Sequence, residues 1–236
     1  EIWATGNRLV KLDITPDGEL HIQWAKLPAG VPTEMLEYAL EDKSGNLWLV
    51  KEGDGIYRVS PDNQVRHYDE GQHAFAILTL CEDKWGNIYG GSPRNGLFRY
   101  DKKQDTFVSL SYLSDEKLSV RSIYCTDQNT LYICTDGEGL KQLDIQGNQL
   151  SDFLIEDDRI DSHRAKVHFM FQDRTGNYWL AIYQKGVMMI PTHPNGFKYL
   201  GYKSVSRNLI GSHCVTSLYQ SSDGTMYVGT DNDGLY

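Results

Sequence analysis

The stretch that decides the fold is Leu80–Gly91 (LCEDKWGNIYGG), which is followed after three residues by Asn95–Asp101 (NGLFRYD). The pattern recurs as Leu40–Leu49 (LEDKSGNLWL) with Asp54–Val59 (DGIYRV), and as Phe171–Leu180 (FQDRTGNYWL) with Lys185–Met188 (KGVM). Each copy combines an Asp-x-x-Gly-Asn segment, an aromatic-aliphatic run and a second glycine. A pattern that returns in register predicts one supersecondary unit that is used several times.

Three further copies are weaker. Only the tail of a copy is present at Ile2–Thr5 and Arg8–Asp13, and the last copy covers Ser221–Thr230 and Asp233–Tyr236. The fourth copy is degenerate, because Thr126 and Asn129 stand where Asp and Gly are expected. The repeat therefore occurs six times, and we expect the local loop shape to differ where the pattern departs from the rest.

Aromatic residues mark the period of the repeat. They occur at Trp3, Trp48, Tyr89, Tyr132, Trp179 and Tyr227, with spacings of 45, 41, 43, 47 and 48 residues. This period is the length of one propeller blade. The chain is therefore predicted to be an all-β protein, a β-propeller with six partial or complete four-stranded blades. The predicted blades are 1–30 (partial), 31–72, 73–114, 115–160, 161–208 and 209–236 (partial).

Each part of the repeat has a structural interpretation. The Asp-x-x-Gly-Asn segment predicts a tight hairpin turn, because Gly adopts positive φ and Asp accepts bonds from nearby backbone N–H groups. The aromatic-aliphatic run is typical of a strand, and the second glycine opens the next one. Fourth, more variable strands are predicted at Leu20–Trp24, Val65–Tyr68, Phe107–Leu110, Leu150–Leu154 and Phe197–Tyr202. Helix is barely indicated.

Composition limits the function. The formal net charge of −9 argues against broad binding to nucleic acid, which requires clustered Lys and Arg. No run of 18 apolar residues is present, so the sequence predicts no membrane-spanning helix. The repeat begins directly at the first residues. We therefore expect the chain to be a piece of a longer polypeptide.

The four cysteines are Cys81, Cys125, Cys134 and Cys214, and they show no CxxC spacing that would predict a zinc site. All four fall in predicted strands, where a free cysteine behaves as a small hydrophobe, and this interpretation is favoured. A cross-strand disulfide between Cys125 and Cys134, on either side of one hairpin turn, is the alternative.

The repeat resembles the two-component regulator propeller repeat. The resemblance rests on Val120–Tyr124 (VRSIY), on the Asp-x-x-Gly-Asn-Leu-Trp-Leu pattern and on the Asp-Gly-Leu segment that follows. It covers the whole chain at a strength that varies by blade. It implies a seven-bladed ring and the periplasmic sensor region of a hybrid two-component system histidine kinase of the Bacteroides type, at the bacterial inner membrane. Implied partners are an oligosaccharide or other small extracellular ligand, an adjoining propeller, an immunoglobulin-like domain of the same chain, and a second copy in a homodimer.

Candidate ligand-binding residues lie in the loops that a propeller gathers on one face, because binding residues concentrate on loops held by a rigid scaffold. Aligned without gaps, Arg121, His168 and Thr216 occupy equivalent positions at the channel end of successive inner strands. The predicted ligand-binding residues are Arg94, Asn95, Arg121, Asp136, Glu138, His163, Arg164, His168, Tyr183, Gln184, His213, Asp231 and Asn232. The plainer alternative is that Asn95 forms a turn and that Arg121 is simply preferred by the repeat.

No catalytic motif, metal ligand set or cofactor-binding loop is evident in the sequence. The favoured function is a sensor module without enzymatic activity of its own, within a parent that is a sensor histidine kinase. The two alternatives are a propeller lyase of the streptogramin-lyase type and a non-catalytic protein-interaction scaffold.

Overall fold

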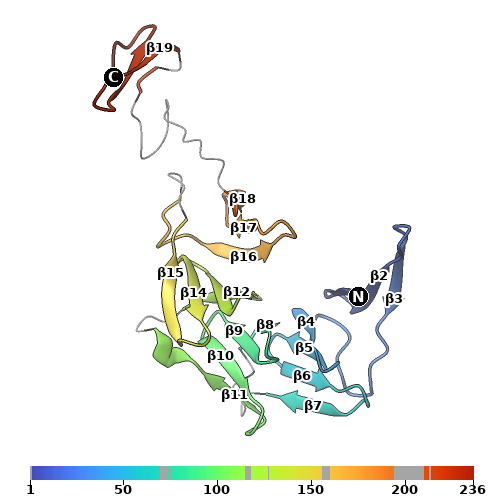
Figure 1. Ribbon diagram of the computed structural model, residues 1–236. Helices are drawn as coiled ribbons and strands as arrows, with labels where there is room; N and C mark the ends of the chain where they lie inside the picture. Colours follow the sequence, from blue (N-terminus) through green and yellow to red (C-terminus); the bar gives the residue numbers. More distant parts are fainter. Residues whose placement is uncertain are drawn as a thin grey trace.

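The computed structural model describes residues 2–69, 74, 76–114, 118–126, 128–155, 160–193, 210–212 and 214–236. These residues form six antiparallel sheets, and Figure 1 shows the first five following one another along an arc. The fold is therefore an all-β propeller assembly, as predicted. Among the described residues, the one helical element is the short 3-10 helix η2 (Ser111–Leu113), and none of them forms a helix that could span a membrane.

Strands follow one another in sequence order across each sheet. Blade one contains β1 (Ile2–Ala4), β2 (Val10–Ile14) and β3 (Leu20–Trp24). Blade two contains β4 (Tyr38–Glu41), β5 (Leu47–Lys51), β6 (Gly55–Val59) and β7 (Val65–Tyr68). Blade three contains β8 (Thr79–Glu82), β9 (Ile88–Ser92), β10 (Gly96–Asp101) and β11 (Thr106–Ser109). Blade four contains β12 (Val120–Cys125), β13 (Thr130–Thr135), β14 (Leu140–Asp144) and β15 (Gln149–Phe153). Blade five contains β16 (Val167–Gln172), β17 (Tyr178–Ile182) and β18 (Gly186–Ile190), and blade six contains β19 (Val215–Gln220) and β20 (Met226–Thr230).

Each sheet falls inside the residue range predicted for its blade. The predicted fourth strands coincide with β3 and β7, and they differ from β11 and β15 by one residue at each end. The strand predicted at Phe197–Tyr202 lies outside the described residues. Local alternation and turn chemistry were thus sufficient to locate the strands.

The Asp-x-x-Gly-Asn segment forms the hairpin turn that the sequence predicts. In blade two, Asp42 Oδ1 accepts hydrogen bonds from the backbone N–H of Ser44 at 2.9 Å and of Asn46 at 2.8 Å. Gly45 has a φ of 77°, which an L-residue with a side chain rarely adopts. Carboxylate and glycine together therefore close the turn between β4 and β5.

Blade four keeps this turn with different residues. The Thr126 hydroxyl accepts bonds from the backbone N–H of Gln128 at 3.3 Å and of Thr130 at 3.4 Å, which replaces the Asp carboxylate. Asn129 takes the place of the glycine with a φ of 71°. Asn is among the few residues other than Gly that adopt this conformation. The departure from the repeat therefore leaves the hairpin intact.

Neighbouring blades bury their facing side chains against each other. Between blades two and three the cluster contains Trp48, Tyr68, Leu80, Phe98 and Tyr100, and comparable clusters lie between blades one and two, three and four, and four and five. A single blade cannot bury both of its faces, so stacking of blades supplies the core.

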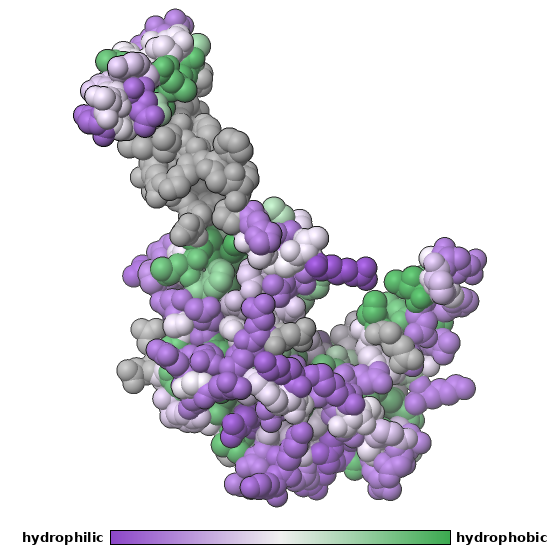
Figure 2. Space-filling view, viewed as in Figure 1, coloured by the Kyte–Doolittle hydropathy of each residue, from purple (hydrophilic) through white to green (hydrophobic). Residues whose placement is uncertain are grey.

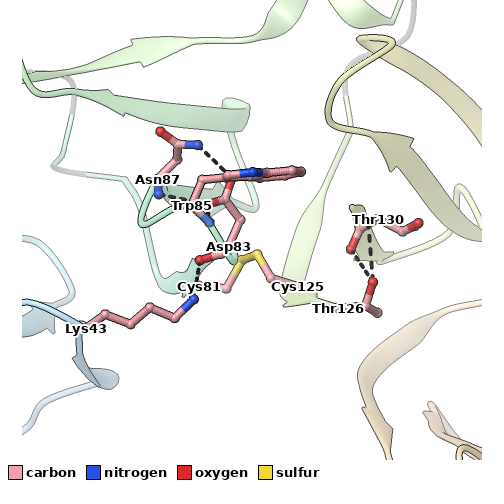
Figure 3. Close-up of a disulfide and its surroundings, with 8 residues drawn as sticks. All are labelled: Lys43, Cys81, Asp83, Trp85, Asn87, Cys125, Thr126 and Thr130. Carbon is pink, nitrogen blue, oxygen red and sulfur yellow. Dashed lines mark hydrogen bonds between the residues drawn. A yellow bond between two sulfur atoms is a disulfide. The ribbon is translucent and has the colours of Figure 1, made fainter. Parts of the chain in front are cut away.

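The prediction of free cysteines is correct for Cys134 and Cys214 and wrong for Cys81 and Cys125. A disulfide joins Cys81 of β8 to Cys125 of β12, so that it links the inner strands of blades three and four across 44 residues of sequence. Figure 3 shows the bond between these two strands, next to the turns that contain Asp83 and Thr126. Cys134 is a buried free thiol, and Cys214 is exposed and precedes β19 rather than lying in a strand. Pairing in the hairpin is excluded because Cys125 lies opposite Leu131, and Cys134 lies opposite Ser122.

Apolar side chains remain exposed on the two terminal blades of this arc. On blade five the exposed set is Phe169, Phe171, Trp179, Val187 and Met189, and on blade one it is Ile2, Ile14, Leu20, Ile22 and Trp24. Figure 2 shows hydrophobic residues gathered on the N-terminal blade and on the C-terminal hairpin. In the repeat, Trp179 is equivalent to the buried Trp48, so the face of blade five has the composition of a blade interface.

Candidate functional site

Three polar side chains occupy matching irregularities in the inner strands of blades four, five and six. The register of each inner strand shifts between Val120 and Ser122, between Val167 and Phe169, and between Val215 and Ser217. The bypassed residues are Arg121, His168 and Thr216. A β-bulge re-aims a side chain and is over-represented next to functional sites. The positions that the sequence alignment equates are therefore also equivalent in backbone geometry.

Asp136 is the centre of a charged cluster that joins blades four and five. Its Oδ2 accepts hydrogen bonds from Arg121 Nη2 at 2.6 Å and Nε at 3.2 Å. Its Oδ1 lies 3.1 Å from Lys166 Nζ and 3.7 Å from His168 Nε2. Three basic side chains thus surround one carboxylate, and we call this set the Asp136 cluster. The sequence predicted Arg121, Asp136 and His168 as candidates, but it missed Lys166.

Lys166 joins the cluster through a backbone contact that has no sequence signal. Asp136 and Lys166 form an isolated antiparallel bridge between the end of β13 and the start of β16. Tyr183 completes the group from the β17–β18 turn, because its ring stacks on His168 at 4.9 Å between centroids. Lys166 Nζ also lies 5.8 Å from the centre of the Tyr183 ring, within cation–π range.

The Arg121 guanidinium, and after it the Lys166 ammonium, lower the pKa of Asp136 to about 2. Because the pKa in the folded chain is below the ordinary value, the ionised carboxylate stabilises the fold at neutral pH. This contribution is present above about pH 4 and is lost as the pH falls toward about 2.

We therefore expect Asp136→Asn to lower the free energy of unfolding by about 1 kcal/mol at pH 7, because Arg121 is partly exposed and its charge is screened by solvent. The difference from wild type should shrink below pH 4 and be lost as the pH falls through about 2. Urea unfolding at a series of pH values measures it. Glu52→Gln is the control, since this exposed side chain makes no ion pair among the described residues. A deficit that persists unchanged at pH 2 would contradict the assignment.

A cavity of about 280 Å³ adjoins the Asp136 cluster. Its lining comes from the inner strands of blades two to five and includes Tyr38, Thr79, Arg121, Ile123, His168 and Phe169. We call it the inner-strand cavity. Two of its lining residues carry a buried polar atom without a hydrogen-bond partner among the described residues, namely Thr79 Oγ1 and His168 Nε2. Such groups are rare in folded proteins, and each requires an explanation.

A second group of predicted residues lines an open groove on blade four. Glu138, His163 and Arg164 contribute to a groove of about 630 Å³ together with Asp152. Asp152 accepts a hydrogen bond from Lys141 Nζ at 2.6 Å and lies 3.0 Å from His163 Nδ1. Lys141, and after it His163, lower the pKa of Asp152. The structure thus separates the predicted residues into the Asp136 cluster and this groove.

The remaining candidates do not join either group. Arg94 and Asn95 are exposed in the β9–β10 turn, where their backbone N–H groups donate to Ser92 Oγ. Gln184 occupies the β17–β18 turn with a φ of 57°. Asp231 and Asn232 follow β20, and Asn232 Oδ1 accepts a bond from the Ser212 hydroxyl at 2.7 Å. His213 lies outside the described residues.

The fold and the repeat together define the class of this chain as a β-propeller built from repeated antiparallel blades. The family model named "Two component regulator propeller" matches residues 208–232, so that the last repeat is a repeat of this kind. No curated protein sequence matches the chain.

Solved structures share the fold. The extracellular domain of a hybrid two component system from B. thetaiotaomicron is 23% identical with a TM-score of 0.60, covering 99% of this chain and 30% of that one. PorZ, a surface component of the type-IX secretion system of Porphyromonas gingivalis, is 16% identical with a TM-score of 0.57, covering 99% and 36%. Virginiamycin B lyase from Staphylococcus aureus is 12% identical with a TM-score of 0.56, covering 99% and 78%. The chain thus spans about a third of the length of this extracellular domain.

Proposed function

We propose that this propeller is the extracytoplasmic recognition part of a hybrid two-component signalling histidine kinase, on the periplasmic side of a bacterial inner membrane. It recognises a glycan or oligosaccharide, and the signal crosses the membrane to control transcription. The observation that carries this proposal is the match of residues 208–232 to the two-component regulator propeller. The adjoining propeller, the immunoglobulin-like domain and the homodimer expected of such a parent belong to the same proposal.

The disulfide supports the proposed compartment. Disulfides form and persist in oxidising environments such as the bacterial periplasm, and they are rare in the reducing cytosol. The Cys81–Cys125 bond links the inner strands of two blades. It therefore has the character of a structural bond of an exported protein.

Recognition alone does not produce a signal. A ligand can shift the conformation of the parent only if it binds one arrangement of the ectodomain more tightly than another. The Asp136 cluster spans blades four and five, so a ligand bound there contacts two blades at once and can favour one arrangement of them.

The proposal is tested with the polypeptide that carries these residues. Membranes containing it are incubated with a panel of oligosaccharides, and phosphorylation of the kinase is measured. We expect one glycan class to change phosphorylation and to bind the purified propeller by calorimetry. A polypeptide without a kinase core, or a kinase that responds to no member of the panel, would overturn the proposal.

The lyase alternative shares only the fold with this chain, because similarity at 12% identity carries no catalytic residue across. Within the described ranges, no three His, Cys, Asp or Glu side chains are grouped to hold a metal ion. Release of a cleaved product from any compound that binds the chain would establish it as an enzyme.

A further inference from the structure

We propose that the inner-strand cavity binds the carboxylate of a small hydroxylated acid, such as one uronic acid residue. The inference rests on the proposed function, because it assigns a chemical class to the ligand that the sensor recognises. It concerns the wall formed by Thr79, Arg121 and His168, which lies on the inner strands and not in the outer loops.

One cation of the cavity lining keeps a donor free for an anion. Arg121 and Lys166 carry two positive charges near the cavity, and Asp136 and the exposed lining residue Glu37 carry two negative charges, so the local charge is balanced although the chain as a whole has a net charge of −9. Arg121 uses Nε and Nη2 for Asp136, which leaves Nη1 without a partner within the described residues. A guanidinium forms strong charge-assisted hydrogen bonds with a carboxylate.

The hydroxyl of Thr79 favours a ligand that can form hydrogen bonds. Thr79 is 2% exposed, and its Oγ1 has no partner in the part of the chain that the structure describes. A buried hydroxyl without a partner destabilises the fold, so its presence at the cavity wall is explained if a ligand supplies the partner. Ser122, which is also buried, adds a second hydroxyl to the wall.

The size of the cavity limits the ligand to one ring. Its volume of about 280 Å³ is just below the range of about 300–1,000 Å³ for small-molecule pockets. Leu78, Ile123 and Phe169 provide apolar wall that can contact the C–H groups of a sugar ring. The cavity therefore has room for one acidic monosaccharide ring.

Calorimetry with matched sugars tests the carboxylate. D-galacturonate and D-glucuronate are titrated into the chain, with D-galactose and D-glucose as neutral counterparts. We expect binding of at least one uronate and none of the neutral sugars. Arg121→Gln should weaken uronate binding by about tenfold or more, because it removes a charge-assisted hydrogen bond. Arg174→Gln, an exposed arginine in the β16–β17 turn that belongs to neither candidate group, is the matched control and should leave binding unchanged.

Thr79→Val separates ligand binding from stability. Removing the unpaired hydroxyl while keeping the shape should raise the Tm of the unliganded chain by about 2–4 °C. The same variant should weaken uronate binding by about tenfold. A residue with only a structural role would change stability without this opposite effect on binding.

The outcomes distinguish the two proposals. Uronate binding that Arg121→Gln and Thr79→Val leave intact, equal binding of the neutral sugars, or no uronate binding to the folded chain would each overturn the cavity assignment. In each of these cases, a kinase response of the parent to a glycan would still support the sensor function. Uronate binding at the cavity without any kinase response would support the cavity assignment and overturn the sensor function.

Discussion

Loss of the Cys81–Cys125 disulfide is expected to lower the free energy of unfolding by about 4 kcal/mol. The bond closes a loop across a sequence separation of 44 residues, and removing it restores the conformational freedom of that loop to the unfolded chain. It also removes the covalent link between the inner strands of blades three and four, where Cys81 is buried with Tyr89 and Ile123. Reduction should therefore weaken one specific blade interface.

The measurement is urea unfolding of wild type and of the Cys81→Ala/Cys125→Ala variant, each refolded with and without a phosphine reductant. The wild type in reductant should unfold at the lower midpoint of the double variant, which should itself not respond to the reductant. Cys214→Ser is the control, since this free thiol is exposed. A wild-type midpoint that is the same in both conditions would show that the bond does not contribute to stability.

The sequence was sufficient to predict the blades because the residues that form each hairpin are close together in the chain. The Asp carboxylate, the positive φ of the glycine and the aromatic-aliphatic run lie within ten residues, so each hairpin can be recognised in one window. In blade four the Thr126 hydroxyl replaces the carboxylate as hydrogen-bond acceptor, and Asn129 adopts the positive φ of the glycine, so the turn forms although both residues depart from the repeat.

The contacts between blades could not be derived in this way. The sequence offered Cys134, nine residues away, as the alternative disulfide partner of Cys125. The actual partner, Cys81, is brought close by the neighbouring inner strand. Lys166 likewise reaches Asp136 through a bridge between two blades. Thr79 has no signal in the sequence at all, because its significance depends on an unpaired hydroxyl at a cavity wall. Repeat patterns describe one blade, and the candidate site lies between blades.

Replacing Trp48 by Ala is expected to destabilise the chain by about 3–5 kcal/mol, the range for a large buried aromatic side chain. Trp48 is 1% exposed, and its ring lies 5.0 Å from that of Tyr100 and 5.8 Å from that of Tyr68. Its Nε1 donates a hydrogen bond to Asp42 Oδ2 at 2.8 Å. The substitution therefore opens a cavity between blades two and three and leaves a turn carboxylate without one of its donors.

Trp179 provides the matched comparison because it occupies the same position of the repeat. Its Nε1 donates an equivalent bond to Asp173 Oδ2 at 2.8 Å, but the side chain is 40% exposed on the uncovered face of blade five. Trp179→Ala should therefore shift the urea midpoint much less than Trp48→Ala, since less apolar surface is exposed and no cavity forms. Equal shifts would show that the face around Trp179 is covered in solution as fully as the face around Trp48. The exposed apolar side chains of blade five would then be part of a closed blade interface and not a free surface.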